Sequence, residues 1–246
     1  MIRTLCLLLS LLALALHAGL PPEKRILFLG DSITQGGAYV EFIEAALIAR
    51  HPDSDKQIIP LGLSSETVSG LSEEGHAGGK FPRPDLHERL DRALEKTRPQ
   101  LVFACYGMND GIYYPLGEER FQAFKNGMKK LHDKVVASGA RIIHLTPPVF
   151  DPVPIKNRVL PAGLDKYEKP FEGYNQVLDA YSDWLLSMRQ EGWEVLDIHG
   201  PFNAALAEKR RTDPQFWANS DDIHQWYFRH DPLNAGLLDY NRMENR

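Results

Sequence analysis

The sequence predicts an α/β fold built on a five-stranded parallel sheet. Short apolar runs alternate with longer amphipathic segments along most of its 246 residues, a pattern typical of repeated βα units. The composition is 43% hydrophobic and 25% charged, which excludes a disordered, collagen-like or solenoid chain. We find no internal repeat and no linker between domains. A single α/β domain is therefore expected.

The N-terminal segment is expected to be a signal peptide, covering residues 1–18. Arg3 precedes an apolar run that is short for a membrane span. Cleavage after Ala15 fits the small-residue rule better than cleavage after Ala18. The alternative interpretation is an uncleaved membrane anchor. We therefore expect a secreted or periplasmic protein whose domain covers residues 19–246, with no stable membrane insertion once the leader is removed.

Five short apolar runs are the predicted strands. Their near-continuous apolar character is typical of strands that are buried on both faces of a parallel sheet. The runs are residues 26–29, 57–59, 101–105, 141–145 and 194–198.

Amphipathic helices are predicted between these strands. Apolar residues recur three or four positions apart over 121–135 and 174–188, so each segment presents one apolar face to the sheet. The same spacing is weaker over 40–47 and 86–94. Pro99 and the glycines at 139 and 192 are expected to end helices just before the next strand. Two connections, 64–84 and 147–170, are long for this architecture, and long ordered loops often carry function.

Chemically distinctive residues follow three of the predicted strands. Asp31 and Ser32 come after the first strand, Gly62 after the second and Asn109 after the third. Ligands bind at the carboxyl ends of the strands in open parallel sheets. Taken singly, Ser32 is equally well explained as a helix cap and Asn109 as a turn residue. Their joint occurrence favours a single reaction mechanism.

That mechanism is acyl transfer by an activated serine. The Ser32 hydroxyl needs a neutral imidazole to take its proton, and His224 is the candidate base. Asp221 stands three residues before it and is the candidate carboxylate that orients the ring. The backbone N–H groups of Ser32 and Gly62 and the side-chain amide of Asn109 are candidate donors to the oxyanion.

These motifs resemble the sequence blocks of the SGNH, or GDSL-type, superfamily of esterases and acylhydrolases. The resemblance implies a three-layer α/β/α, flavodoxin-like fold, an SGNH hydrolase domain, a Ser-His-Asp triad and an oxyanion hole. It implies neither a metal nor an organic cofactor. The matching blocks are Gly-Asp-Ser-Ile-Thr at 30–34, Gly62, Gly-Met-Asn-Asp at 107–110 and Asp-Asp-Ile-His at 221–224.

The C-terminal segment departs from the pattern of this superfamily. Its members usually continue after the catalytic histidine with a proline and a final helix, whereas this chain ends at Arg246 with only a weak helical pattern. His230 is an alternative base, because the residues after it faintly resemble the usual continuation. His224 is preferred because Asp221 precedes it by three residues. Asp222 is an alternative orienting residue.

Charge and cysteine content exclude other classes. The formal net charge is −5 and no basic stripe is present, so we expect no nucleic-acid partner. Cys105 is the one cysteine beyond the leader, which excludes an internal disulfide. His199 and Asp197 suggest metal ligation but lack clustered partners, so no metal site is expected. The oligomeric state is left open.

Several side chains after the second and third blocks are candidate substrate contacts. Lys80 and Arg83 offer charge, and the rings of Tyr113 and Tyr114 offer a stacking surface to sugars. Asp31, beside the nucleophile, is a further candidate. The absence of a lipid-binding apolar stretch favours a soluble ester over a bilayer substrate.

We therefore expect a secreted serine esterase that removes small acyl groups, above all acetyl, from a small molecule or a glycan. The link to carbohydrate rests on the resemblance alone. The alternatives are a lysophospholipase, thioesterase or arylesterase, a non-catalytic carbohydrate-binding relative, and a truncated product that packs poorly.

Overall fold

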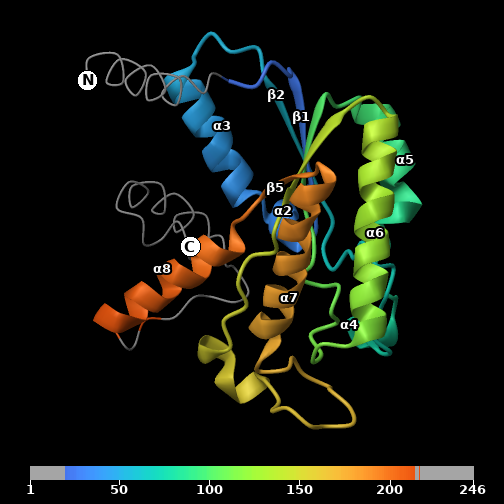
Figure 1. Cartoon of the computed structure of the whole chain (residues 1–246), viewed down its shortest axis with the longest axis vertical. Coiled ribbons are helices and arrows are strands. Elements are labelled where there is room, and N and C mark those ends of the chain that lie inside the picture. Colours follow the sequence, from blue (N-terminus) through green and yellow to red (C-terminus); the bar gives the residue numbers. More distant parts are fainter. Residues whose placement is uncertain (1–19, 214–215, 217–246) are drawn as a thin grey trace, which may run out of the picture.

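The computed structural model describes residues 20–213 and Phe216. Its centre is one five-stranded sheet in the order β2-β1-β3-β4-β5, and every neighbouring pair is parallel (Figure 1). The predicted α/β class and the five-stranded parallel sheet are confirmed. The strands are β1 (Arg25–Gly30), β2 (Gln57–Gly62), β3 (Leu101–Cys105), β4 (Arg141–Leu145) and β5 (Glu194–Leu196).

The strand register brings three strand ends level with one another. β1 lies between β2 and β3, and its last residue, Gly30, is paired with Gly62 on one side and Cys105 on the other. Segments that follow these three strands therefore leave the sheet at neighbouring points on the same edge. The switch in strand order between β1 and β3 also lies there, which is where open α/β sheets bind ligands.

One face of the sheet is covered by α5 (Leu86–Thr97), α6 (Glu118–Ala137) and α7 (Tyr174–Ser187). The apolar positions that predicted these helices form their buried faces, because residues three and four apart share one side of a helix. They pack with β1, β3 and β4 in the main core. Its helical members include Leu86, Leu90, Leu94, Phe124, Met128, Leu131, Val135, Tyr174, Val177, Tyr181 and Leu185.

The other face is packed by α3 (Ala38–Arg50), which lies across the sheet from α5 and α6 (Figure 1). Val40 joins Phe28 and neighbouring β-strand residues in a second, smaller core. Within α3, Val40 is the buried residue, whereas Ile43 and Ile48 are 44% and 61% exposed. Helices therefore lie on both sides of the sheet, as the predicted three-layer arrangement requires.

The helix ends follow the predicted stop signals. Arg98 adopts a left-handed conformation after α5 and is followed by Pro99. Gly139 and Gly192 have φ of 85° and 84°, a region that glycine enters without steric cost. Five helices of the described residues were not predicted from the sequence, four of them short and one, α8, as long as α7. They are α2 (Ser32–Gly36), α4 (His76–Gly79), α8 (His199–Thr212) and two 3₁₀ helices, η1 (Val153–Arg158) and η2 (Met188–Glu191).

Several predictions fall outside the residues that the structure describes. They are the signal peptide over 1–18, both candidate bases, His224 and His230, and both candidate orienting residues, Asp221 and Asp222. Across the described residues, no helix combines the length and the apolar character needed to cross a bilayer.

Candidate active site

Ser32, Gly62 and Asn109 lie at the carboxyl ends of three adjacent strands. Ser32 is the exposed first residue of α2, directly after β1. Gly62 is the last residue of β2, and Asn109 follows β3 in a buried turn. The amide Nδ2 of Asn109 lies 3.3 Å from Oδ2 of Asp31, the residue that precedes Ser32. The fold therefore gathers the residues that the sequence had separated by up to 77 positions, from 32 to 109.

The turn from β1 into α2 needs glycine at residue 30. A Cβ there would lie 2.2 Å from Thr34 Oγ1 and 2.9 Å from the carbonyl oxygen of Cys105. Asp31 caps the helix, since its Oδ1 accepts a 2.9 Å hydrogen bond from the Ile33 N–H. Asp31, and not Ser32, is therefore the N-terminal cap of α2, and Ser32 is exposed at the start of the helix.

Gly62 lies against the same helix. A Cβ at residue 62 would come within 2.0 Å of the Gln35 nitrogen and 2.5 Å of the Thr34 carbonyl carbon. Any side chain there would force β2 and α2 apart. The close approach places the backbone at Gly62 beside the helix that carries Ser32.

The amide of Asn109 is surrounded by four hydrogen-bond partners. Its Oδ1 accepts from Arg83 Nη1 at 3.1 Å and from the Tyr113 hydroxyl at 3.3 Å. Its Nδ2 faces Asp31 Oδ2 at 3.3 Å and the Glu66 carbonyl oxygen at 3.2 Å. Asn109 is thus more than a turn residue, and its NH₂ group points towards Asp31, the residue before Ser32.

The turn after β3 is strained and firmly tied down. Ile112 and Tyr113 have φ of 57° and 56°, a left-handed conformation that costs non-glycine residues about 1–3 kcal/mol each. Asp110 accepts hydrogen bonds from the N–H groups of Gly107, Val68 and Ser69 at 3.0, 2.9 and 2.8 Å. The turn and the 64–84 loop are therefore held together beside Ser32.

Burial shifts the acidity of two carboxyl groups at this site. The pKa of Asp31 rises to about 7, first because the group is buried and then because Asp110 and Glu66 lie near; the Ile33 N–H and Arg83 oppose the rise. The pKa of Asp110 rises to about 6 through burial, although backbone N–H groups favour its ionised form. Both carboxyl groups are fully enclosed, at 1% and 0% exposure.

The predicted substrate contacts occupy different positions. Lys80 is exposed on the 64–84 loop. Asp31 is buried and accepts hydrogen bonds from the Ile33 N–H and the Asn109 amide. Tyr113 is half-buried beside Asn109, with its ring 4.8 Å from that of Tyr174. Arg83 is 8% exposed, and its guanidinium donates hydrogen bonds to Glu73 and Asn109. Lys80 and Tyr113 therefore keep surface that a substrate can reach.

In the described part of the chain, no histidine forms a hydrogen bond to Ser32. His199 lies at the start of α8, and both of its ring nitrogens are engaged, with the Pro147 carbonyl at 3.0 Å and Asp179 Oδ1 at 2.8 Å. Asp197, which had suggested a metal site with it, instead accepts from Thr146 Oγ1 at 3.0 Å. His199 thus offers no free nitrogen to a nucleophile or to a metal.

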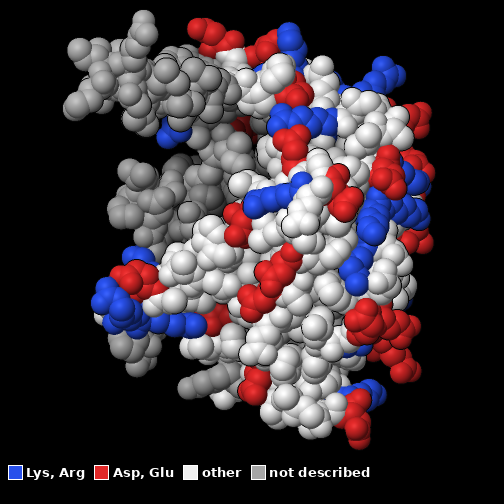
Figure 2. Space-filling model, viewed as in Figure 1, with Lys and Arg blue, Asp and Glu red and all other residues white. Residues whose placement is uncertain are grey.

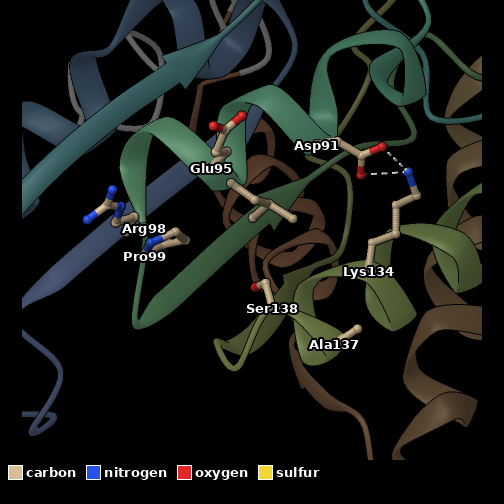
Figure 3. A pocket seen from close by; sticks show the side chains of 8 residues that line it. Asp91, Glu95, Arg98, Pro99, Lys134, Ala137 and Ser138 are labelled. Carbon is tan, nitrogen blue, oxygen red and sulfur yellow. Dashed lines mark hydrogen bonds and ion pairs between the residues drawn. The ribbon is translucent and has the colours of Figure 1, made fainter.

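A surface groove of about 740 Å³ lies away from this site (Figure 3). It is formed by the C-terminal parts of α5 and α6, where Lys134 bridges to Asp91 with two 2.6 Å contacts. Pro99 at its wall precedes β3, so the groove is at the amino ends of the strands, opposite to Ser32. It is not part of the candidate active site.

The face of the molecule that Figure 2 shows carries both signs of charge. On the face shown in Figure 2, lysine and arginine alternate with aspartate and glutamate over the side occupied by α6 and α7. A mixed surface of this kind gives no single-sign field to steer a charged ligand.

A serine, a glycine and an asparagine at the ends of β1, β2 and β3 in this sheet order define a class, the SGNH-type carboxylic ester hydrolases. The chain belongs to the GDSL-like lipase/acylhydrolase family, whose sequence profile matches residues 28–225. A profile of fatty acid cis/trans isomerase also matches residues 206–245, a short stretch that lies mostly outside the described residues. No curated protein sequence matches the chain.

Solved structures of similar fold include several enzymes. BT4096, a gut microbial diltiazem-metabolizing enzyme, is 23% identical with a TM-score of 0.63 over 82% of this chain, which spans 43% of BT4096. The acetylxylan esterase Axe2 from Geobacillus stearothermophilus is 19% identical with a TM-score of 0.55, covering 75% of this chain and 80% of Axe2. LAE5, an alpha/beta hydrolase from the Lake Arreo metagenome in Spain, is 22% identical with a TM-score of 0.53, covering 74% and 80%.

Proposed function

We propose that this protein is a secreted serine esterase that hydrolyses small acyl esters, above all acetyl esters, with Ser32 as nucleophile. The observation that carries the proposal is the convergence of Ser32, Gly62 and Asn109 at three adjacent strand ends. Membership of an acylhydrolase family supports the reaction type. The signal-peptide pattern of residues 1–18 supports secretion.

In the proposed reaction, Ser32 Oγ attacks the ester carbonyl while His224 takes its proton, and Asp221 orients the imidazole. The oxyanion is stabilised by the N–H groups of Ser32 and Gly62 and by Asn109 Nδ2. His224 then protonates the leaving alcohol. Water, deprotonated by the same histidine, releases the acid from the acyl-enzyme and restores Ser32.

We propose an acetylated carbohydrate as the substrate class. The fold shared with an acetylxylan esterase supports this choice. Tyr113, half-buried beside Asn109 with its ring packed against Tyr174 and under Arg83, is a proposed contact through the part of its side chain that stays exposed. Lys80, exposed on the neighbouring loop, is a proposed contact for hydroxyl or carboxylate groups of the glycan. No metal or cofactor takes part in the proposed steps.

The test compares the full protein with its Ser32→Ala variant. Hydrolysis of p-nitrophenyl acetate, butyrate and octanoate is measured for both, followed by intact mass after fluorophosphonate treatment. We expect acetate-selective turnover and one covalent adduct, both lost in Ser32→Ala. Preference for octanoate would instead favour a lysophospholipase or thioesterase. Absence of turnover and of the adduct in the wild type would overturn the proposed function.

A further inference from the structure

Arg83 is a buried cation that contacts the Asn109 side chain, and its guanidinium also lies over the Tyr113 ring, 5.6 Å from the ring centroid. Its Nε and Nη2 donate to Glu73 Oε2 and Oε1 at 2.6 and 2.8 Å. Its Nη1 donates to Asn109 Oδ1 at 3.1 Å, with the Ser65 carbonyl oxygen 3.4 Å away. The residue is 8% exposed, so it has little surface to offer a substrate.

The surroundings of the Asn109 amide allow one orientation. A guanidinium can only donate hydrogen bonds, so the amide atom that faces Arg83 must be the oxygen. The opposite end faces two acceptors, Asp31 Oδ2 and the Glu66 carbonyl oxygen. A half-turn of the amide would set NH₂ against the guanidinium and oxygen against both acceptors. Arg83, with the Tyr113 hydroxyl that donates to the same oxygen at 3.3 Å, therefore directs the NH₂ group towards Asp31, the residue before Ser32.

Arg83 is itself held rigidly. Glu73 binds it through both oxygens, and the planar fork of arginine matches a carboxylate in this bidentate geometry. Burial disfavours the ionised form of Glu73, but the hydrogen bonds from Arg83 keep its pKa below the ordinary value. His76 Nδ1 lies 3.1 Å from the same carboxylate of Glu73. The backbone N–H of Arg83 donates to Ser72 Oγ at 2.9 Å. The 64–84 loop thus fixes the guanidinium in place.

We propose that Arg83 is a positioning residue for catalysis: it orients the Asn109 amide so that Nδ2 can donate to the oxyanion formed at Ser32. The inference rests on the proposed function. The developing oxyanion would compete for the N–H that faces Asp31 at 3.3 Å. A donor that is already oriented stabilises the transition state without reorganisation, whereas a freely turning amide does not.

Loss of Arg83 is expected to lower kcat more than it changes KM. Removal of one oxyanion donor typically costs about 10²–10³-fold in rate, and misorientation of that donor should cost about tenfold or more. For p-nitrophenyl acetate, which has no sugar to contact Tyr113, KM should stay within about threefold, because Arg83 is buried and donates its hydrogen bonds to protein groups. Arg83→Lys should retain intermediate activity, since an ammonium keeps the charge but lacks the planar fork.

A double-mutant cycle tests this coupling. It measures kcat and the rate of fluorophosphonate labelling for the wild type, Arg83→Met, Asn109→Ala and the double variant. We expect Arg83→Met to lower both rates in the wild-type background and to change them less than threefold when Asn109 is already alanine. Equal losses in the two backgrounds, or a rise in KM alone, would overturn the inference while the proposed function stands.

Arg141→Met is the matched control for loss of an arginine–carboxylate pair. Arg141 also binds a carboxylate through both oxygens, with 2.6 and 2.5 Å contacts to Glu194, but it lies at the amino end of β4, at the opposite edge of the sheet from Asn109. We expect both methionine variants to lower Tm, and Arg83→Met alone to lower kcat about tenfold or more. If Arg83→Met does not fold, the cycle is run with Arg83→Lys. A wild type that neither turns over ester nor labels at Ser32 overturns the proposed function and this inference together.

Discussion

Close contacts with α2 require glycine at residues 30 and 62, and only for Gly62 does this contact join segments that are distant in sequence. A methyl group on either would overlap α2, with Thr34 at 2.2 Å from one and Gln35 at 2.0 Å from the other. Glycine is required at both positions because α2, the helix that begins at Ser32, lies against the ends of β1 and β2. For Gly62, this contact is a packing reason for glycine that is separate from any role in the oxyanion hole.

Asp31 gives the protein a pH-dependent stability. Its carboxyl has a folded pKa raised from 3.8 to about 7, so the native state binds a proton that the unfolded state has released between these values. The contribution of Asp31 to the free energy of unfolding is therefore greatest below pH 3.8, and it decreases as the pH rises from 3.8 towards 7. The decrease is complete above the folded pKa.

We expect Asp31→Asn to remove this dependence while keeping an oxygen to cap Ile33. The free energy of unfolding of the variant minus that of the wild type should increase, by up to about 1.4 kcal/mol per pH unit, as the pH rises from 3.8 to about 7. Urea unfolding at a series of pH values from 4 to 8 measures it. A difference between the two proteins that does not change with pH would contradict the prediction.

At the level of elements, the 64–84 loop and α6 meet at Gly127. A Cβ at this helical position would lie 2.0 Å from the Val68 carbonyl oxygen. Glycine inside a helix is unfavourable by about 0.5–1 kcal/mol relative to alanine, so its presence here reflects the contact. The absence of a side chain at Gly127 lets the loop pack directly against α6. In the same loop, the N–H groups of Val68 and Ser69 donate to Asp110, which lies in the turn after β3.

Gly127→Ala is expected to destabilise the protein by about 1–3 kcal/mol and to lower kcat, because the displaced loop carries Arg83. Thermal unfolding and p-nitrophenyl acetate hydrolysis measure the two effects. Asn126→Ala is the matched control, since Asn126 is exposed on the same turn of α6 and its replacement should leave both nearly unchanged. Equal Tm values for the two variants would argue against this packing.

Elements with a clear apolar period were predictable from sequence. α6 and α7 followed from residues spaced three and four apart, because the same side chains that create the period also fill the core. α2 was not predicted, since a helix of five residues is too short to show a period. α8 was also missed; Leu206 joins the core but most of its residues remain exposed.

At the scale of the whole molecule, the described residues carry the proposed nucleophile and oxyanion donors, and the candidate bases lie in the segment after residue 216. His199 is excluded as the base because both of its nitrogens are occupied. The reaction proposed here uses His224 and thus requires that this residue of the C-terminal segment reach Ser32.

We expect His224→Ala to lower kcat by about 10⁴-fold or more, and His230→Ala to retain activity within about threefold. Loss of Asp221 should be less severe than loss of His224, because it removes an orienting group and not the base itself. Steady-state hydrolysis of p-nitrophenyl acetate separates the variants. An inactive His230→Ala beside an active His224→Ala would reassign the base to His230.

The sequence by itself determined the α/β class, the five strands, the helices with a clear apolar period and the positions of Ser32, Gly62 and Asn109 at strand ends. These features follow from apolar periodicity and from the rule that parallel strands end at one edge. The tertiary structure alone decided that Asp31 is buried and that Arg83 faces Asn109. Such contacts join residues far apart in the chain, and burial and hydrogen bonding depend on which segments the fold brings together.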